Sequence, residues 1–275
     1  MNEIRRPWPV QYIDSHSHLA DPRLDSPEDQ LRRDWLTRAA AKGITHHLQG
    51  GVGPEDWQRQ LHLQQQFPQT LPVFGLHPYW VAAHSDDECE NALDLLAQLQ
   101  GQCLAIGEMG LDLRPHIAGE SRDRQITCFE SQLELCAAAN KPAVLHIVRA
   151  FEEAEKILQI WGVPPRGGFV HSFNGSAKEA EAYLALGLMI SVGGPIARAK
   201  NERLRQAVRV TPMECLLLET DAPDQPGDQF HGGLNPSESL WGVAQAVATI
   251  KGLEAEEILD ISSQNLRKLL QLQGL

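Results

Sequence analysis

Two histidines stand one residue apart near the start of the chain, in the segment YIDSHSHL (residues 12–19). In an extended strand, residues i and i+2 point to the same side, so His16 and His18 would project together. Two imidazoles on one side of a strand can bind a cation. A pair of surface histidines would also explain so short a motif. Whether the pair belongs to a metal site therefore depends on further candidate ligands elsewhere in the sequence.

Residues of metal-binding types also stand at or just after the ends of short apolar runs farther along the chain. Each of them alone has an ordinary explanation, such as a salt bridge, a turn or a satisfied polar group. Together, imidazole nitrogens and carboxylate oxygens suit Zn, Mn, Fe, Co or Mg. The residues that we predict to form one metal site are His16, His18, Glu108, His146, His171 and Asp221.

The apolar runs alternate with amphipathic stretches, which predicts parallel strands joined by crossover helices. The expected strands are residues 12–14, 44–49, 71–76, 103–106, 143–147, 168–171, 188–192 and 215–219. The expected helices are residues 27–42, 54–67, 87–100, 120–140, 151–161, 176–186, 198–210, 237–251 and 255–272.

Eight expected strands favour an α/β protein of the (β/α)8 TIM-barrel type, in which the carboxyl ends of the strands meet at one mouth. A doubly wound sheet is the alternative, but the chain lacks a glycine-rich dinucleotide fingerprint after the first expected strand. We expect residues 1–275 to form a single domain, because no shift in composition marks a linker. The segment 221–236, rich in proline and glycine, is expected to form a loop over the mouth.

The composition is that of a globular protein, with 42% hydrophobic and 22% charged residues. We expect neither a membrane span nor a signal peptide, because no sufficiently long apolar run is present. The five scattered cysteines form no CxxC pair, which favours reduced thiols in a cytoplasmic protein. The formal net charge of −12 argues against broad electrostatic binding of nucleic acid, so a polyanion would have to be attracted locally.

The motifs DSHSHL, GLHP, GEMGLD, VLH, VHSF and LLLETDAP occur in the order and spacing of the TatD family of metal-dependent deoxyribonucleases. The chain resembles this branch of the amidohydrolase-like barrels over residues 13–265, and its loop ETDAPDQPGDQFHGGLNPSE is especially similar to the YjjV-like branch. The resemblance implies hydrolysis of DNA phosphodiesters with two divalent ions. Mg2+ is the expected functional metal, and Zn2+, Mn2+, Fe2+ and Co2+ are alternatives. The implied substrate is the end of a DNA strand, processed by a 3′ to 5′ exonuclease on single strands, with no obligatory protein partner.

The resemblance also implies individual roles for the ligands. His16 and His18 would bind one ion together with Asp221, which would also act on the attacking water, and Glu108 would bridge to a second ion. That second ion would be held by the remaining two histidines, His146 and His171. Glu108 and Asp221 are therefore the expected catalytic residues.

Two residues are expected to bind substrate. His77 lies at the position of the family's Gly-x-His-Pro motif and would approach the phosphate. The family usually has His-x-Arg after the fifth strand, whereas here the arginine comes one position later, as Arg149. In a helix start, one position rotates a side chain by about 100°, which changes the direction from which Arg149 would reach a phosphate.

Two other functions remain compatible with the same residues. The first is a barrel hydrolase of a carbonyl ester or amide, for example an aminoacyl ester on tRNA, because water activated on a metal serves that reaction too. The second is a metal-binding partner subunit with little turnover. Barrels of this kind support many chemistries, so the fold alone does not separate these functions.

Overall fold

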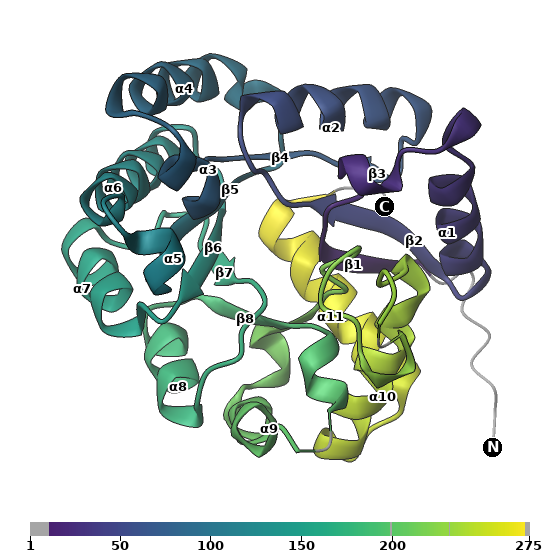
Figure 1. Cartoon of the computed structure of the whole chain (residues 1–275). Coiled ribbons are helices and arrows are strands. Elements are labelled where there is room, and N and C mark those ends of the chain that lie inside the picture. Colours follow the sequence, from purple (N-terminus) through teal and green to yellow (C-terminus); the bar gives the residue numbers. More distant parts are fainter. Residues whose placement is uncertain (1–10, 199, 231, 273–275) are drawn as a thin grey trace.

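The structure is a computed structural model that describes residues 11–198, 200–230 and 232–272. Strands occupy the centre of the molecule and helices form a ring around them (Figure 1). The strands are β1 (Tyr12–Ser17), β2 (Ile44–Gln49), β3 (Thr70–Leu71), β4 (Val73–Phe74), β5 (Ala105–Asp112), β6 (Ala143–Val148), β7 (Gly168–Val170), β8 (Met189–Val192) and β9 (Leu216–Leu218).

The paired strands are parallel, and their spatial order follows the sequence, as β1-β2-β3 and β4-β5-β6-β7-β8-β9. Pro72, which lacks a backbone N–H, separates β3 from β4, so the expected strand 71–76 is two short strands that end at Phe74. The first and last strands also meet. The Asp221 backbone N–H donates to the His16 carbonyl at 3.0 Å, and the His18 N–H donates to the Ala222 carbonyl at 2.6 Å. The fold is the expected (β/α)8 barrel.

The helices are α1 (Gln30–Ala41), α2 (Pro54–Gln66), α3 (Pro78–Ala83), α4 (Asp86–Leu99), α5 (Pro115–Ala118), α6 (Arg122–Ala138), α7 (Phe151–Trp161), α8 (Ala177–Ala185), α9 (Glu202–Val210), α10 (Leu240–Lys251) and α11 (Ala255–Leu270). Helices α1 to α9 lie between strands in the sequence, whereas α10 and α11 follow the last strand. Most helices cover the outside of the barrel, but α11 lies inside the ring in the view of Figure 1, against the inner apolar cluster. The short helices α3 and α5 were not expected from the sequence. In the part of the chain that the structure describes, every helix is too short or too polar to cross a bilayer.

The barrel interior has an apolar layer and a polar layer. The apolar layer includes Ile13, Val144, Phe169 and Leu217, and leucines of α11 complete the same cluster. The alternating residues of these strands pack outward, against the helices. Helix α11 also holds the barrel by hydrogen bonds, because the Ser263 hydroxyl accepts from the Ile13 N–H at 2.9 Å. The polar layer lies toward the carboxyl ends of the strands, where the candidate site is found.

Candidate metal centre

The strand period positions the expected ligands in the barrel interior. His146 and His171 each stand two positions after a residue of the inner apolar layer, Val144 and Phe169 respectively. Because alternate side chains of a strand share one face, the two histidines continue the inward-facing row. His16 lies in β1, where the pairing with β2 shifts register between residues 14 and 17. All three histidines are buried.

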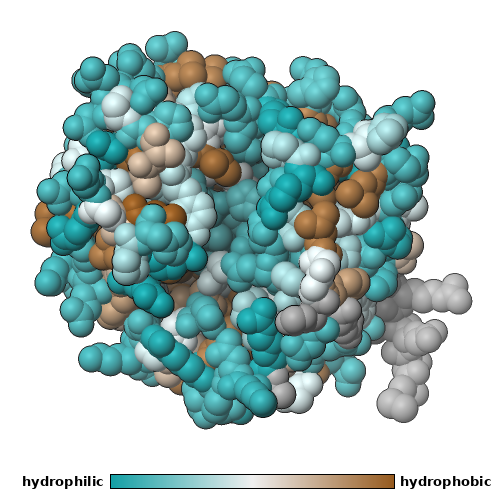
Figure 2. Space-filling view, in the orientation of Figure 1, coloured by the Kyte–Doolittle hydropathy of each residue, from teal (hydrophilic) through white to brown (hydrophobic). Residues whose placement is uncertain are grey.

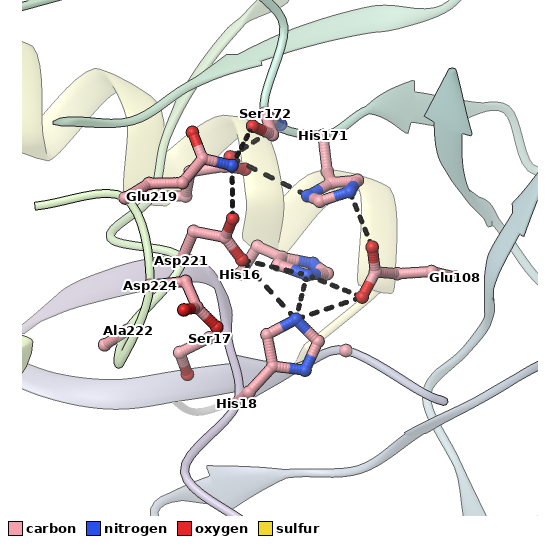
Figure 3. Close-up of polar contacts among 12 residues, drawn as sticks. His16, Ser17, His18, Glu108, His171, Ser172, Glu219, Asp221, Ala222 and Asp224 are labelled. Atoms are coloured by element: carbon pink, nitrogen blue, oxygen red, sulfur yellow. Dashed lines mark hydrogen bonds and ion pairs between the residues drawn. The ribbon is translucent and has the colours of Figure 1, made fainter. Parts of the chain in front are cut away.

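Glu108 lies between two pairs of histidines and presents one oxygen to each pair. Figure 3 shows it between His16 and His18 on one side and His171 on the other. Its Oε1 is 3.3 Å from His16 Nε2 and 3.0 Å from His18 Nε2. Its Oε2 is 2.6 Å from His171 Nε2 and 3.2 Å from His146 Nδ1. The expectation that the HxH histidines project together is confirmed, since their Nε2 atoms are 3.3 Å apart. This is the arrangement of a carboxylate that can bridge two cations.

Asp221 joins the side of the site that His16 and His18 form. Its Oδ1 lies 3.4 Å from His18 Nε2 and 3.8 Å from His16 Nε2. Its Oδ2 accepts a hydrogen bond from Gln225 Nε2 at 2.5 Å, which fixes the orientation of the carboxylate. One Asp221 oxygen therefore remains directed at the histidines.

The donor set fits divalent cations. Among the residues that the structure describes, three groups have ligand atoms within 4.8 Å of one another: His16, His18 and Glu108; His16, His171 and Asp221; and His77, Glu108 and His146. Glu108 Oε1 is buried and, within the described residues, has no hydrogen-bond partner. Pairs of imidazole nitrogens that face each other across about 3 Å need a proton or a cation between them. A divalent cation held by these residues would satisfy the nitrogens and the unpartnered carboxylate oxygen together.

Burial and the surrounding charges give the ionisable residues of the site different pKa values and protonation states. Burial lowers the pKa of His171 to about 4, although the Glu108 carboxylate opposes this shift. Burial acts in the same direction on His146, but hydrogen bonds to Asp112 and Glu108 outweigh it and raise the pKa to about 9. Burial would raise the pKa of Glu108, yet the neighbouring histidines, His171 first, hold it well below its usual range. Glu108 is therefore an anion, as a bridging ligand must be.

Two carboxylates behind the histidines were missed in the sequence. Asp112 Oδ2 is 3.4 Å from His146 Nε2, and Glu219 Oε1 is 3.8 Å from His171 Nδ1. Glu219 is held in turn by the Ser172 N–H at 2.6 Å and the Ser191 hydroxyl at 2.5 Å. Asp112 is close enough to orient the His146 imidazole. Glu219 is too far from His171 Nδ1 for a hydrogen bond and instead positions His171 through the backbone N–H of the next residue, Ser172.

A third buried carboxylate, Asp14, fastens the first strand to the segment after the last one. Its Oδ1 accepts from the Thr220 N–H at 2.9 Å, and its Oδ2 accepts from the Thr220 hydroxyl at 2.5 Å. Strand periodicity could have identified all three carboxylates. Asp14 precedes His16 by two positions, Asp112 follows Glu108 by four, and Glu219 precedes Asp221 by two.

His77 lines the cavity of the site, which has a volume of about 600 Å3. Its Nδ1 accepts the Tyr79 backbone N–H at 2.9 Å, so the neutral ring carries its proton on Nε2. Burial, reinforced by the charge of His146, holds the pKa of His77 well below its usual range. His77 Nε2 lies 3.6 Å from Glu108 Oε2, so a donor N–H faces the cavity. A protonated Nε2 favours contact with a substrate oxygen, although His77 also belongs to one of the three groups whose ligand atoms could hold a cation.

Arg149 lies outside this cavity. It lines a neighbouring cavity of about 700 Å3 that shares a wall with the first one. Its backbone has a φ of 54°, in the left-handed region, and this conformation of the loop helps to set the direction of the side chain. The arginines that do line the metal cavity are Arg23 and Arg114, which were not expected.

Comparisons with known proteins agree with the fold. Residues 13–271 match the family described as TatD related DNase. This chain belongs to the TatD family. Several relatives at this similarity are named metal-dependent hydrolases, and the chain is a TatD-family metal-dependent hydrolase.

Individual relatives cover nearly the whole chain. The uncharacterized metal-dependent hydrolase YjjV of Escherichia coli (strain K12) is 32% identical over 250 residues, which is 90% of this chain and 93% of the relative. The 3′-5′ ssDNA/RNA exonuclease TatD of Pantoea sp. (strain At-9b) is 35% identical over 247 residues, or 88% of this chain and 94% of that protein. The crystal structure of YjjV, a TatD homolog from Escherichia coli K12, superposes with a TM-score of 0.85 at 30% identity and covers 97% of this chain and 100% of its own.

Proposed function

We propose that the protein hydrolyses DNA phosphodiester bonds as a 3′ to 5′ exonuclease on single strands, with Mg2+ as the functional metal. The observation that carries the proposal is the position of Glu108, whose two oxygens face two separate histidine pairs. Two-cation sites of this kind suit the displacement of one oxygen by another at phosphorus. The name of the Pantoea relative, an ssDNA/RNA exonuclease, supports the choice of substrate.

The metal ligands in this proposal are His16, His18, Glu108, His146, His171 and Asp221. Bound divalent cations would polarise the phosphodiester and lower the pKa of the attacking water. Asp221 remains ionised because the His18 hydrogen bond and the nearby histidine charges outweigh burial and keep its pKa below the usual range. With Oδ2 occupied by Gln225, Asp221 Oδ1 is the atom that accepts a proton from the water. His77 donates from Nε2 to a nonbridging phosphate oxygen.

The rim of the cavity supports capture of a strand end over binding along a duplex. Arg23 pairs with Asp21 at 2.8 Å and with Asp224 at 2.5 Å. Arg114 pairs with Asp112 at 2.5 Å. Because carboxylates offset both arginines, and the formal net charge of the chain is −12, little positive charge is left to follow a long phosphate backbone.

The test is cleavage of a single-stranded oligonucleotide by protein that has been stripped of metal and reloaded with Mg2+ or Mn2+. One substrate carries its label at the 5′ end and another at the 3′ end. Stepwise shortening from the 3′ end is expected for the wild type. Loss of turnover by at least about 100-fold is expected for Asp221→Asn, because an amide cannot accept the proton.

The matched control is Asp123→Asn, since the Asp123 side chain is 94% exposed on α6. This variant should cleave like the wild type. If the metal-loaded wild type leaves every oligonucleotide intact, the proposal is wrong, and carbonyl ester and amide substrates become the next ones to assay. A normal rate for Asp221→Asn would remove the proton-accepting role from that residue.

A further inference from the structure

An exposed aromatic side chain stands on the wall of the metal cavity. Tyr79, in the first turn of α3, lines the cavity together with His77, Glu108 and His146. Its side chain is 42% exposed. The face of the molecule that Figure 2 shows is hollowed near its centre and is largely hydrophilic around the hollow. A single exposed tyrosine is ordinary on a protein surface, so a binding role for Tyr79 depends on the residues around it.

Tyr79 is held on two sides. Its ring meets the His77 ring in an edge contact, with the centroids 4.6 Å apart and an interplanar angle of 64°. The Arg114 guanidinium carbon lies over the Tyr79 ring, 5.2 Å from the centroid. A ring supported in this way loses little conformational freedom when a second flat group stacks on it.

The arginine is held as well. Asp112 accepts from Arg114 Nε at 2.9 Å and from Nη2 at 2.5 Å, one bond to each carboxylate oxygen. The same carboxylate lies 3.4 Å from His146 Nε2. A chain of contacts thus connects a candidate metal ligand, through Asp112 and Arg114, to the tyrosine ring. The relative positions of the aromatic surface and of the metal centre are set by one network.

Asp112 also determines what Arg114 can offer to a ligand. The bidentate pair offsets the positive charge of the guanidinium but leaves its plane available, and guanidinium planes stack on flat rings. Tyr79 and Arg114 together are therefore a stacking surface more than a phosphate-binding one. Single-stranded nucleic acids are commonly held by aromatic and arginine surfaces beside the reacting backbone.

We propose that Tyr79 and Arg114 form a stacking platform for the base of the nucleotide whose phosphodiester bond is cleaved. This inference rests on the proposed function and specifies how the substrate is held. Every base has a flat face, so the platform tolerates all four bases. Its role is to distinguish a nucleotide that carries a base from a sugar phosphate without one, and its contribution is expected to be roughly 5- to 100-fold in kcat/KM.

The test compares two single-stranded oligonucleotides that differ only in the 3′-terminal unit, which is a normal nucleotide in one and an abasic tetrahydrofuran analogue in the other. The quantity measured is the ratio of the two kcat/KM values for removal of the terminal unit. For the wild type this ratio is expected to favour the base. For Tyr79→Ala it is expected to fall toward one, whereas Tyr79→Phe, which keeps the ring, should retain most of it.

Trp161→Ala is the matched control, because Trp161 is another exposed aromatic, 44% exposed at the end of α7. Its ratio should equal that of the wild type, and the metal content of all variants should be the same. Equal rates of the wild type on both oligonucleotides, or an unchanged ratio in Tyr79→Ala, would overturn the platform while leaving DNA hydrolysis intact. Failure of the wild type to cleave either oligonucleotide would instead refute the proposed function and, with it, this inference.

Discussion

Gly50, directly after β2, stands against the first pair of histidines, and its replacement by alanine is expected to disable the metal centre. A Cβ atom at this position would lie 2.5 Å from His18 Cε1 and 2.6 Å from both Cε1 and Nε2 of His16. The backbone has little freedom to withdraw. The Gly50 N–H donates to the Ser17 carbonyl at 2.9 Å, and the Gly50 carbonyl accepts from Gln60 Nε2 at 2.9 Å. The two imidazoles therefore have to move.

The size of the effect follows from these distances. Nonbonded carbon atoms prefer separations of about 3.5–4.0 Å, so each ring would have to shift by about 1 Å. His16 is fully buried and cannot make that shift without disturbing its neighbours. A displacement of about 1 Å in a reacting constellation costs roughly 100-fold in rate. We expect a loss of at least this size in metal-dependent hydrolysis, together with weaker metal retention.

The assay measures bound metal by mass spectrometry after dialysis, and oligonucleotide cleavage on the same preparation. Circular dichroism and the thermal midpoint confirm that the variant folds. Gly101→Ala is the control, because an added Cβ there meets nothing within 4 Å. Wild-type metal content and wild-type cleavage in Gly50→Ala would refute the assignment of His16 and His18 as ligands in this geometry.

Three further outcomes are expected. The two Glu219 carboxylate oxygens accept from the Ser172 N–H and the Ser191 hydroxyl, and Glu219→Gln replaces one of these oxygens with an amide NH2 group. Metal affinity, measured by titration, should fall by about 10- to 100-fold. Unchanged affinity would contradict the positioning role of Glu219. Gln60→Ala leaves the buried Val73 N–H and the buried Gly50 carbonyl without their hydrogen-bond partner. The free energy of unfolding, measured in urea, should fall by about 2–4 kcal/mol. A change within the error of the measurement would show that water takes the place of the Gln60 amide. Chelation of a site that is saturated about 100-fold above Kd removes about 2.7 kcal/mol, so EDTA should lower the thermal midpoint by about 5 °C, and re-addition of metal should restore it.

The candidate ligands could be predicted because they follow the strands in the sequence, at the end of the barrel where the site lies. Residue types that bind metals stood at the ends of apolar runs, and a barrel brings those ends together. Glu219 escaped notice because a carboxylate next to a stronger candidate, Asp221, has an ordinary explanation as a solvated charge. Strand periodicity places Glu219 on the inward face with Asp221, but its burial beside His171 depends on the pairing of β7, β8 and β9.

Other details depend on backbone conformation that local sequence does not set. The direction of Arg149 depends on a loop that includes a left-handed residue, and this loop turns the side chain into the neighbouring cavity. Tyr79 and Arg114 follow different strands and meet only when β4 and β5 pair. The apolar run 71–76 predicts one strand, but Pro72 within it lacks the N–H for a ladder hydrogen bond and separates β3 from β4.

The seam between the first and last strands has a consequence for how the protein comes into being. Asp14 and Thr220, which fasten that seam, are 206 positions apart. At ordinary rates of synthesis, roughly 10 to 40 s separate the emergence of these two residues from a ribosome. His16 and His18 are therefore synthesised long before Asp221, and the candidate ligands come together only when the barrel closes. A chain that terminates before β9 lacks Asp221 and therefore carries an incomplete set of candidate metal ligands. We expect hydrolase activity only after the last strand has been synthesised.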